Sequence, residues 1–78
     1  FQAARLFPEM SVLENVELPA VGLGHPRGRA RERALELLDY LGIAHRSNIM
    51  ASALSYGEER LVGIARALAV APKFLLMD

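Results

Sequence analysis

The sequence predicts a mainly α-helical fold. Two serines, Ser11 and Ser55, are each followed three residues later by a glutamate, which is the pattern of a capping box at a helix start. Between residues 28 and 41 apolar residues recur with helical spacing. The continuous apolar run at 74–77 is typical of a strand buried in a parallel sheet, but the sequence offers it no neighbouring strand. We therefore expect a helical domain followed by a short C-terminal apolar strand that lacks its sheet.

The composition limits the classes of protein to consider. With 78 residues the chain forms at most one small domain. Nine basic and nine acidic residues leave no net charge, so the composition favours no nucleic-acid partner. No cysteine is present, which fits a reducing compartment, and no apolar run approaches the roughly 20 residues of a membrane-spanning helix. The chain opens on Phe1 without a charged-then-apolar leader, so we expect a piece of a larger cytoplasmic protein.

The first predicted helix follows a loop. Residues 1–10 contain apolar anchors without a helical or strand period. The capping box of Ser11 starts a helix near Val12, and we expect Pro19 to limit its length. The residues that we expect on its buried side are Val12, Leu13 and Val16.

A second loop and a second helix come next. Residues 22–28 are dense in glycine and proline and are typical of a loop. The pattern from 28 to 40 is helical, and Gly42 ends it in the left-handed conformation that glycine adopts most easily. Neither His25 nor His45 has a second ligand at metal-binding spacing. The expected apolar face of this helix consists of Ala30, Ala34, Leu37, Leu38 and Leu41.

The stretch 54–58 opens the last predicted helix. Backbone N–H groups at a helix start are unpaired and lie at the positive end of the helix dipole, so they can hold an anion. Gly57 has no side chain to keep a ligand away, and Ser55 adds a hydroxyl, which together suit phosphate. Ser55 and Glu58 also form a capping box, and spacing alone does not separate the two roles. We expect Pro72 to end this helix. Its expected apolar stripe is Leu61, Ile64, Ala65, Leu68 and Ala69.

Several segments resemble the ATP-binding-cassette (ABC) ATPase family, in the order that the family has. The run LSYGEERLVGIARALA at 54–69 resembles the signature motif, usually Leu-Ser-Gly-Gly-Gln, and the helix after it. Residues 72–78 resemble the start of the Walker B strand, and Phe1-Gln2 followed by 7–16 resembles the Q-loop region. The resemblance implies the helical subdomain of an α/β P-loop ATPase. The implied division is 1–10, Q-loop region; 11–71, α-helical subdomain with the signature motif at 54–58; and 72–78, start of the Walker B strand.

The resemblance also implies ATP and Mg²⁺ as cofactors. In this family two nucleotide-binding domains close head to tail around two ATP molecules. Gln2 would meet the catalytic metal and the attacking water, and Asp78 would hold Mg²⁺ or its water shell. The P-loop, the switch histidine and the glutamate base after Asp78 are not in this sequence, so we expect these 78 residues alone neither to bind ATP and Mg²⁺ tightly nor to hydrolyse ATP. The residues implied to contact the ATP of the partner subunit are Ser55, Tyr56, Gly57 and Glu58.

Two residues depart from the usual signature motif. Tyr56 replaces the first paired glycine, where its ring narrows the approach to the phosphate, and Glu58 replaces glutamine, where it adds a negative charge. The sequence Ser-Tyr-Gly-Glu is nevertheless similar to the motif of importers of branched-chain and other hydrophobic amino acids.

The resemblance implies a function at the membrane. The chain would be part of the ATP-binding subunit that energises amino-acid import by ATP binding and hydrolysis. Its partners would be a second nucleotide-binding subunit and transmembrane permease subunits, which place it in the cytoplasm, peripheral to the inner membrane. One alternative is another ABC branch, such as a lipopolysaccharide exporter or a non-transport ATPase. A further alternative is a small helical interaction module with no nucleotide role.

Overall fold

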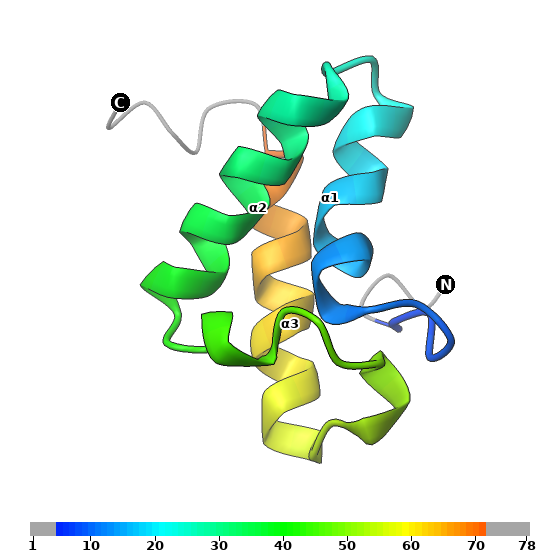
Figure 1. Ribbon diagram of the computed structural model, residues 1–78, viewed down its shortest axis with the longest axis vertical. Helices are drawn as coiled ribbons and strands as arrows, with labels where there is room; N and C mark the ends of the chain where they lie inside the picture. Colours follow the sequence, from blue (N-terminus) through cyan, green and yellow to red (C-terminus); the bar gives the residue numbers. More distant parts are fainter. Residues whose placement is uncertain (1–4, 72–78) are drawn as a thin grey trace.

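Three α-helices and two single-turn 3₁₀ helices make up residues 5–71, the described part of the chain (Figure 1). The computed structural model describes residues 5–71, within which no strand occurs, so the predicted mainly α-helical fold is confirmed. Gln2 and the expected strand at 72–78, which includes Asp78, lie outside the described residues. The helices are α1 (Val12–Gly22), α2 (Arg27–Tyr40), η1 (Ala44–Arg46), η2 (Ala51–Ala53) and α3 (Tyr56–Ala69).

Helix α1 begins where the sequence predicts. The Ser11 hydroxyl accepts from the backbone N–H of Glu14 at 3.0 Å, and the Glu14 carboxylate accepts from the Ser11 N–H at 3.0 Å. The prediction that Pro19 limits the helix is wrong, because α1 continues to Gly22 with Pro19 inside it. Proline removes one N–H donor, which would have bonded to the carbonyl four residues earlier, and the helix tolerates this loss and ends three residues later.

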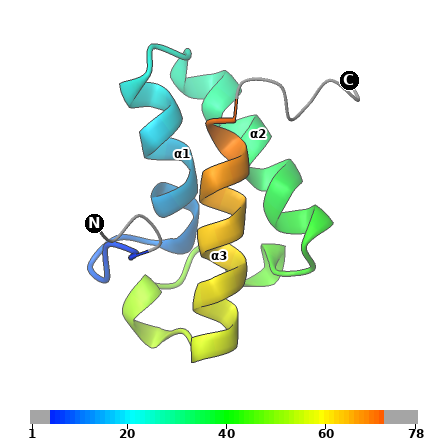
Figure 2. The ribbon, with the colours of Figure 1, turned by 180° about the vertical axis from the view of Figure 1, so that it is seen from behind.

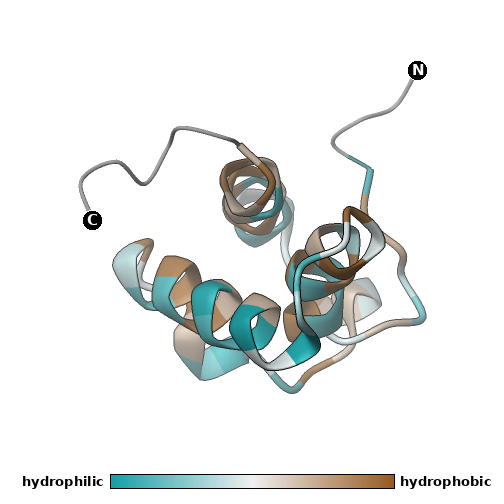
Figure 3. Ribbon diagram, turned by 90° about the horizontal axis from the view of Figure 1, so that it is seen from above, coloured by the Kyte–Doolittle hydropathy of each residue, from teal (hydrophilic) through white to brown (hydrophobic). Residues whose placement is uncertain are grey.

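The buried side of helix α2 is the predicted apolar face. Ala30, Ala34, Leu37 and Leu38 are buried, while Leu41 is half-buried just past the end of the helix. Gly42 has a φ of 79°, the left-handed conformation expected of glycine after a helix. Much of α2 is coloured hydrophilic in Figure 3, since its arginines and glutamates are mostly exposed.

Helix α3 confirms most of the predicted stripe, since Ala65 and Ala69 are buried and Leu61 and Leu68 are partly buried against the core. Val62 is also buried, whereas Ile64, which we expected in the stripe, is 45% exposed. Seen from behind, α3 lies between α1 and α2 (Figure 2), and it contacts both. Periodicity leaves two overlapping stripes on this helix, and packing against two neighbours selects the one that contains Val62.

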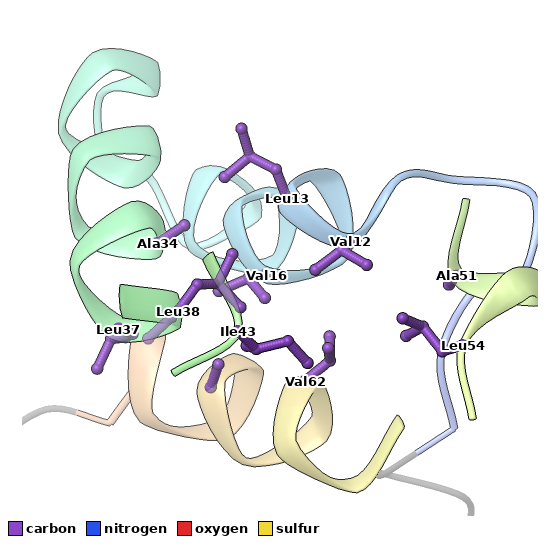
Figure 4. Close-up of a cluster of buried hydrophobic side chains, with 12 residues drawn as sticks. Val12, Leu13, Val16, Ala34, Leu37, Leu38, Ile43, Ala51, Leu54 and Val62 are labelled. Carbon is purple, nitrogen blue, oxygen red and sulfur yellow. The ribbon is translucent and has the colours of Figure 1, made fainter. Parts of the chain in front are cut away.

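The core lies among the three helices and the turns that join α2 to α3 (Figure 4). Val12 and Val16 meet Val62 and Leu38 there, and all four are inaccessible to solvent. Ile43 and Leu54 extend the core beneath the turns. Burial of such a side chain contributes about 1.5–3 kcal/mol, so these contacts fix how α3 sits on the other helices.

Asn15 ties the loop before α1 to the helix. Its amide is buried, at 1% exposure of the residue, and its Oδ1 accepts from the Phe7 N–H at 2.7 Å. Its Nδ2 donates to the carbonyls of Phe7 and Ser11 at 3.0 and 2.9 Å, with a longer contact of 3.4 Å to that of Met10. One side chain therefore satisfies several backbone groups of this loop.

The same loop is bonded to the segment that leads into α3. The carbonyls of Pro8 and Met10 accept from the N–H groups of Ser52 and Ala51 at 3.0 and 2.9 Å. An antiparallel bridge also joins Ser11 to Met50. The loop before α1 is thus held beside the segment that leads into α3. Within residues 5–71, no helix is long and apolar enough to cross a membrane.

We predict that Asn15→Ala lowers the free energy of unfolding by about 2 kcal/mol, because it leaves buried backbone groups unpaired. Urea denaturation of the 78-residue chain measures the change. Asn48→Ala is the control, since Asn48 is exposed and its removal should change stability by less than about 0.5 kcal/mol. Equal effects of the two substitutions would contradict the role given to Asn15.

Candidate functional site

The segment 54–58 begins with a buried leucine and continues as an exposed polar loop. Leu54 is 9% exposed and belongs to the core, while the residues after it, Ser55 to Gly57, are exposed. The segment lies at the end of the molecule where η2 meets α3 (Figure 1). Core packing therefore fixes the base of the loop and leaves its polar atoms accessible.

A capping box forms the loop, as predicted. The Ser55 hydroxyl accepts from the Glu58 N–H at 3.2 Å, and the Glu58 carboxylate accepts from the Ser55 N–H at 2.9 Å. The Ser55 carbonyl accepts from the Glu59 N–H at 2.9 Å. Within residues 5–71 the N–H groups of Tyr56 and Gly57 have no acceptor, so two amides at the positive end of α3 are available to an anion.

Gly57 has open space around its α-carbon. A Cβ built at this position would meet no atom within 4 Å, and the backbone φ is not in the left-handed region. Neither packing nor backbone conformation in the described chain therefore requires a glycine here. The absence of a side chain leaves the exposed backbone at Gly57 open to a ligand.

Glu58 is held by a residue from another element. Arg46, at the end of η1, donates from Nη2 to Glu58 Oε1 at 3.2 Å. Its Nε lies 3.2 Å from Glu58 Oε2, an ion pair whose geometry at that nitrogen is not that of a hydrogen bond. The pKa of Glu58 is lowered, first because the Ser55 N–H donates to the carboxylate and then because Arg46 lies beside it, while partial burial opposes both effects.

Tyr56 is exposed and contacts an arginine of the same helix. The Arg60 guanidinium carbon lies 5.9 Å from the centroid of the Tyr56 ring, within the range of a cation–π contact. The two residues are four apart, so they are neighbours along one side of α3. This contact places a positive charge next to the residue that departs from the usual motif.

The structure brings together one part of the predicted site. Ser55, Gly57 and Glu58 share the capping box and its free amides, and Tyr56 lies at its edge. Gln2 and Asp78 fall outside the described residues. Between residues 5 and 71, no three histidine, cysteine or acidic side chains form a group that could hold a metal ion.

Sequence reasoning missed Arg46. It is separated from Glu58 by 12 residues, so no local pattern signals the pair. Asn15 was also missed, although it lies three residues after Val12 on the predicted buried side, where a polar residue suggests a hydrogen-bonded role.

One cavity lies away from this loop. Its volume is about 660 Å³, and Ala20, Arg29 and Ala69 are among the residues that line it. Ala69 ends α3, whereas the candidate loop is at the start of the same helix. The cavity therefore adds nothing to the phosphate chemistry of segment 54–58.

Known proteins match this chain over its whole length. The family model described as ABC transporter matches residues 1–78. The chain is 49% identical over 78 residues to the lipoprotein-releasing system ATP-binding protein LolD 2 of Caulobacter vibrioides, covering 100% of this chain and 34% of that one. It is 43% identical over 79 residues to the arginine transport ATP-binding protein ArgV of Corynebacterium glutamicum, covering 100% of this chain and 31% of that one.

A solved structure has the same fold. The ADP conformation of an ATP-binding cassette of an ABC transporter superposes with a TM-score of 0.69 and 30% identity, covering 85% of this chain and 31% of that one. The chain spans about a third of the length of the curated relatives it matches.

We predict that Glu58 makes the stability of the loop acid-sensitive. Because its pKa is lowered from the ordinary 4.5, the stabilisation by the carboxylate is present above pH 4.5 and is lost as the pH falls through the lowered pKa. Urea unfolding of the 78-residue chain and of Glu58→Gln, from pH 7 to pH 3, measures the difference. We expect the wild type to be more stable at pH 7 and the gap to close in acid; a gap that is constant with pH would contradict this.

Proposed function

The chain belongs to the ABC transporter family, and from this premise we propose that it supplies the signature loop of an ATP-hydrolysing subunit. In the full-length protein this loop binds the ATP that a second nucleotide-binding subunit holds. The observation that carries the proposal is the exposed start of α3, where the amides of Tyr56 and Gly57 have no acceptor among residues 5–71 and lie beside the Ser55 hydroxyl.

The described residues fit a phosphate. Two unpaired N–H groups and the dipole of a 14-residue helix favour an anion at this position. The Ser55 oxygen accepts from the Glu58 N–H, which leaves the hydroxyl hydrogen free to point outward and donate. The open space at Gly57 lets phosphate oxygens reach the backbone.

We propose that the loop acts by positioning and charge stabilisation. The N–H groups and the Ser55 hydroxyl orient the terminal phosphate and stabilise the charge that builds up on it during transfer. Bound Mg²⁺ would neutralise the same phosphates, and Gln2 and Asp78 are the residues proposed to hold it. Closure of the two subunits would exclude water from this face of the loop.

The partners and the location follow from the same proposal. A second nucleotide-binding subunit is needed to complete the ATP site, and transmembrane permease subunits are needed to couple it to transport. The protein would therefore work at the cytoplasmic face of the cell membrane.

We propose amino-acid import as the transport process, because the Ser-Tyr-Gly-Glu motif resembles that of importers of branched-chain and other hydrophobic amino acids, and because several relatives are named as amino-acid transport proteins. Lipoprotein release is the second candidate, favoured by relatives of that name at 47–51% identity. Deleting the gene separates the two: loss of labelled amino-acid uptake supports import, and retention of lipoproteins in the inner membrane supports release.

We predict that Ser55→Asp in the full-length protein lowers ATPase turnover by about 100-fold, because it puts a negative charge where the phosphate binds. Aspartate is as good a helix cap as serine, so the melting temperature should change little. Binding of ATP to the protein's own P-loop, measured with a fluorescent analogue, should be preserved.

Ser11→Ala is the matched control for Ser55→Asp, since Ser11 forms the same capping box at the start of α1. It should reduce stability by about 1 kcal/mol and leave turnover unchanged. Undiminished turnover in Ser55→Asp would exclude phosphate binding by the loop.

We predict that Gly57→Ala separates stability from activity. A Cβ at this position meets nothing, and alanine is favoured over glycine in a helix by up to about 1 kcal/mol, so the protein should be at least as stable. Turnover should nevertheless fall, because the methyl group occupies the space that phosphate oxygens need. Thermal melts and steady-state ATPase assays of the full-length protein measure both quantities.

Gly28→Ala is the control for Gly57→Ala. Gly28 is likewise the second residue of its helix, and a Cβ there also meets nothing. Its stability should change in the same direction without loss of turnover. If both variants kept full turnover, Gly57 would have no role in ligand approach.

A further inference from the structure

Arg46 reaches the signature loop from a different element. It ends η1, whereas Glu58 is in the first turn of α3. Two contacts of 3.2 Å join their side chains, from Nη2 to Oε1 and from Nε to Oε2. The side chains are 32% and 29% exposed, so water screens the pair less than it screens a fully exposed one.

The capping box does not need this arginine. At the start of α1, Ser11 and Glu14 make the same two hydrogen bonds, each 3.0 Å long. In the described part of the chain, the side chain of Glu14 has no arginine partner. Arg46 therefore contributes something at the start of α3 that the fold of a capped helix does not require.

The charges around the loop indicate what that contribution is. The first turn of α3 carries Glu58 and Glu59, which directly follow Tyr56 and Gly57 in the sequence. Arg60 lies over the Tyr56 ring, and Arg46 contacts Glu58. With Arg46 the four ionic groups balance; without it the loop carries a net negative charge, which opposes a phosphate.

We infer that Arg46 is a positioning residue that offsets the charge of Glu58, so that the phosphates of ATP can approach the amides of Tyr56 and Gly57. The inference rests on the proposed function of the loop. It also accounts for the glutamate at a position where the family usually has glutamine: a neutral side chain needs no counter-charge, and Glu58 has one.

Kinetics of the full-length protein test the inference. The variants are Arg46→Gln, Glu58→Gln and the double substitution, each assayed for the KM and kcat of ATP hydrolysis. Arg46→Gln should raise KM about fivefold, the effect of one uncompensated charge near a phosphate in a solvated interface. The double variant should return KM to within about twofold of the wild type, because the charge to be offset is gone. Arg46→Lys should keep most of the wild-type KM, because it keeps the charge.

Two further measurements separate charge from structural support. Raising the salt concentration should shrink the ratio of the Arg46→Gln and wild-type KM values, because salt screens an exposed charge; a purely structural defect would not respond in this way. Arg31→Gln is the matched control, since it breaks the ion pair with Glu17, 3.2 Å in length, away from the loop. It should lower the melting temperature and leave KM unchanged.

The outcomes distinguish a failure of the inference about Arg46 from a failure of the proposed function. If the wild type hydrolyses ATP and Ser55→Asp does not, but Arg46→Gln has the wild-type KM, the inference about Arg46 is overturned and the proposed function stands. A raised KM that Glu58→Gln fails to restore, or that does not respond to salt, also overturns it. If the wild type itself lacks ATPase activity with its partner subunits present, the proposed function fails first.

Discussion

Mutual burial of three short helices is the constraint on which the structure depends. Helices of 11–14 residues are marginal in isolation, because nucleation is costly and few hydrogen bonds follow it. Val62 and Ala65 of α3 are completely buried against the other helices, and the small alanine lets the backbones approach. A domain of this size has little apolar area to spare, so the position of α3, and with it the loop at its start, is set by these few contacts.

That constraint explains which features were predictable from the sequence. The starts of α1 and α3 depend on Ser-x-x-Glu patterns within four residues, and the end of α2 depends on Gly42, so local chemistry is enough to place them. Pro19 misled the prediction because α1 tolerates the loss of one N–H donor and ends only three residues later. Ile64 misled it because periodicity does not say which of two stripes faces a neighbour.

In the candidate site, too, the features set by adjacent residues were predictable and those that join distant residues were not. The capping box and the free amides of segment 54–58 follow from residues that are adjacent in sequence, and the resemblance to a signature motif rests on them. The contact of Arg46 with Glu58 and the hydrogen bonds of Asn15 join residues from different elements, and only the packed chain brings them together. A charge that looks unfavourable for phosphate in the linear sequence is thus paired in three dimensions.

The hydrogen bonds between the loop before α1 and the segment before α3 have an evolutionary consequence. They run from the N–H groups of Ala51 and Ser52 to the carbonyls of Met10 and Pro8, and no side chain takes part. Every amino acid except proline carries the same donor, so the junction itself makes no demand on the side chains at these four positions. The same junction can therefore form between segments whose sequences differ.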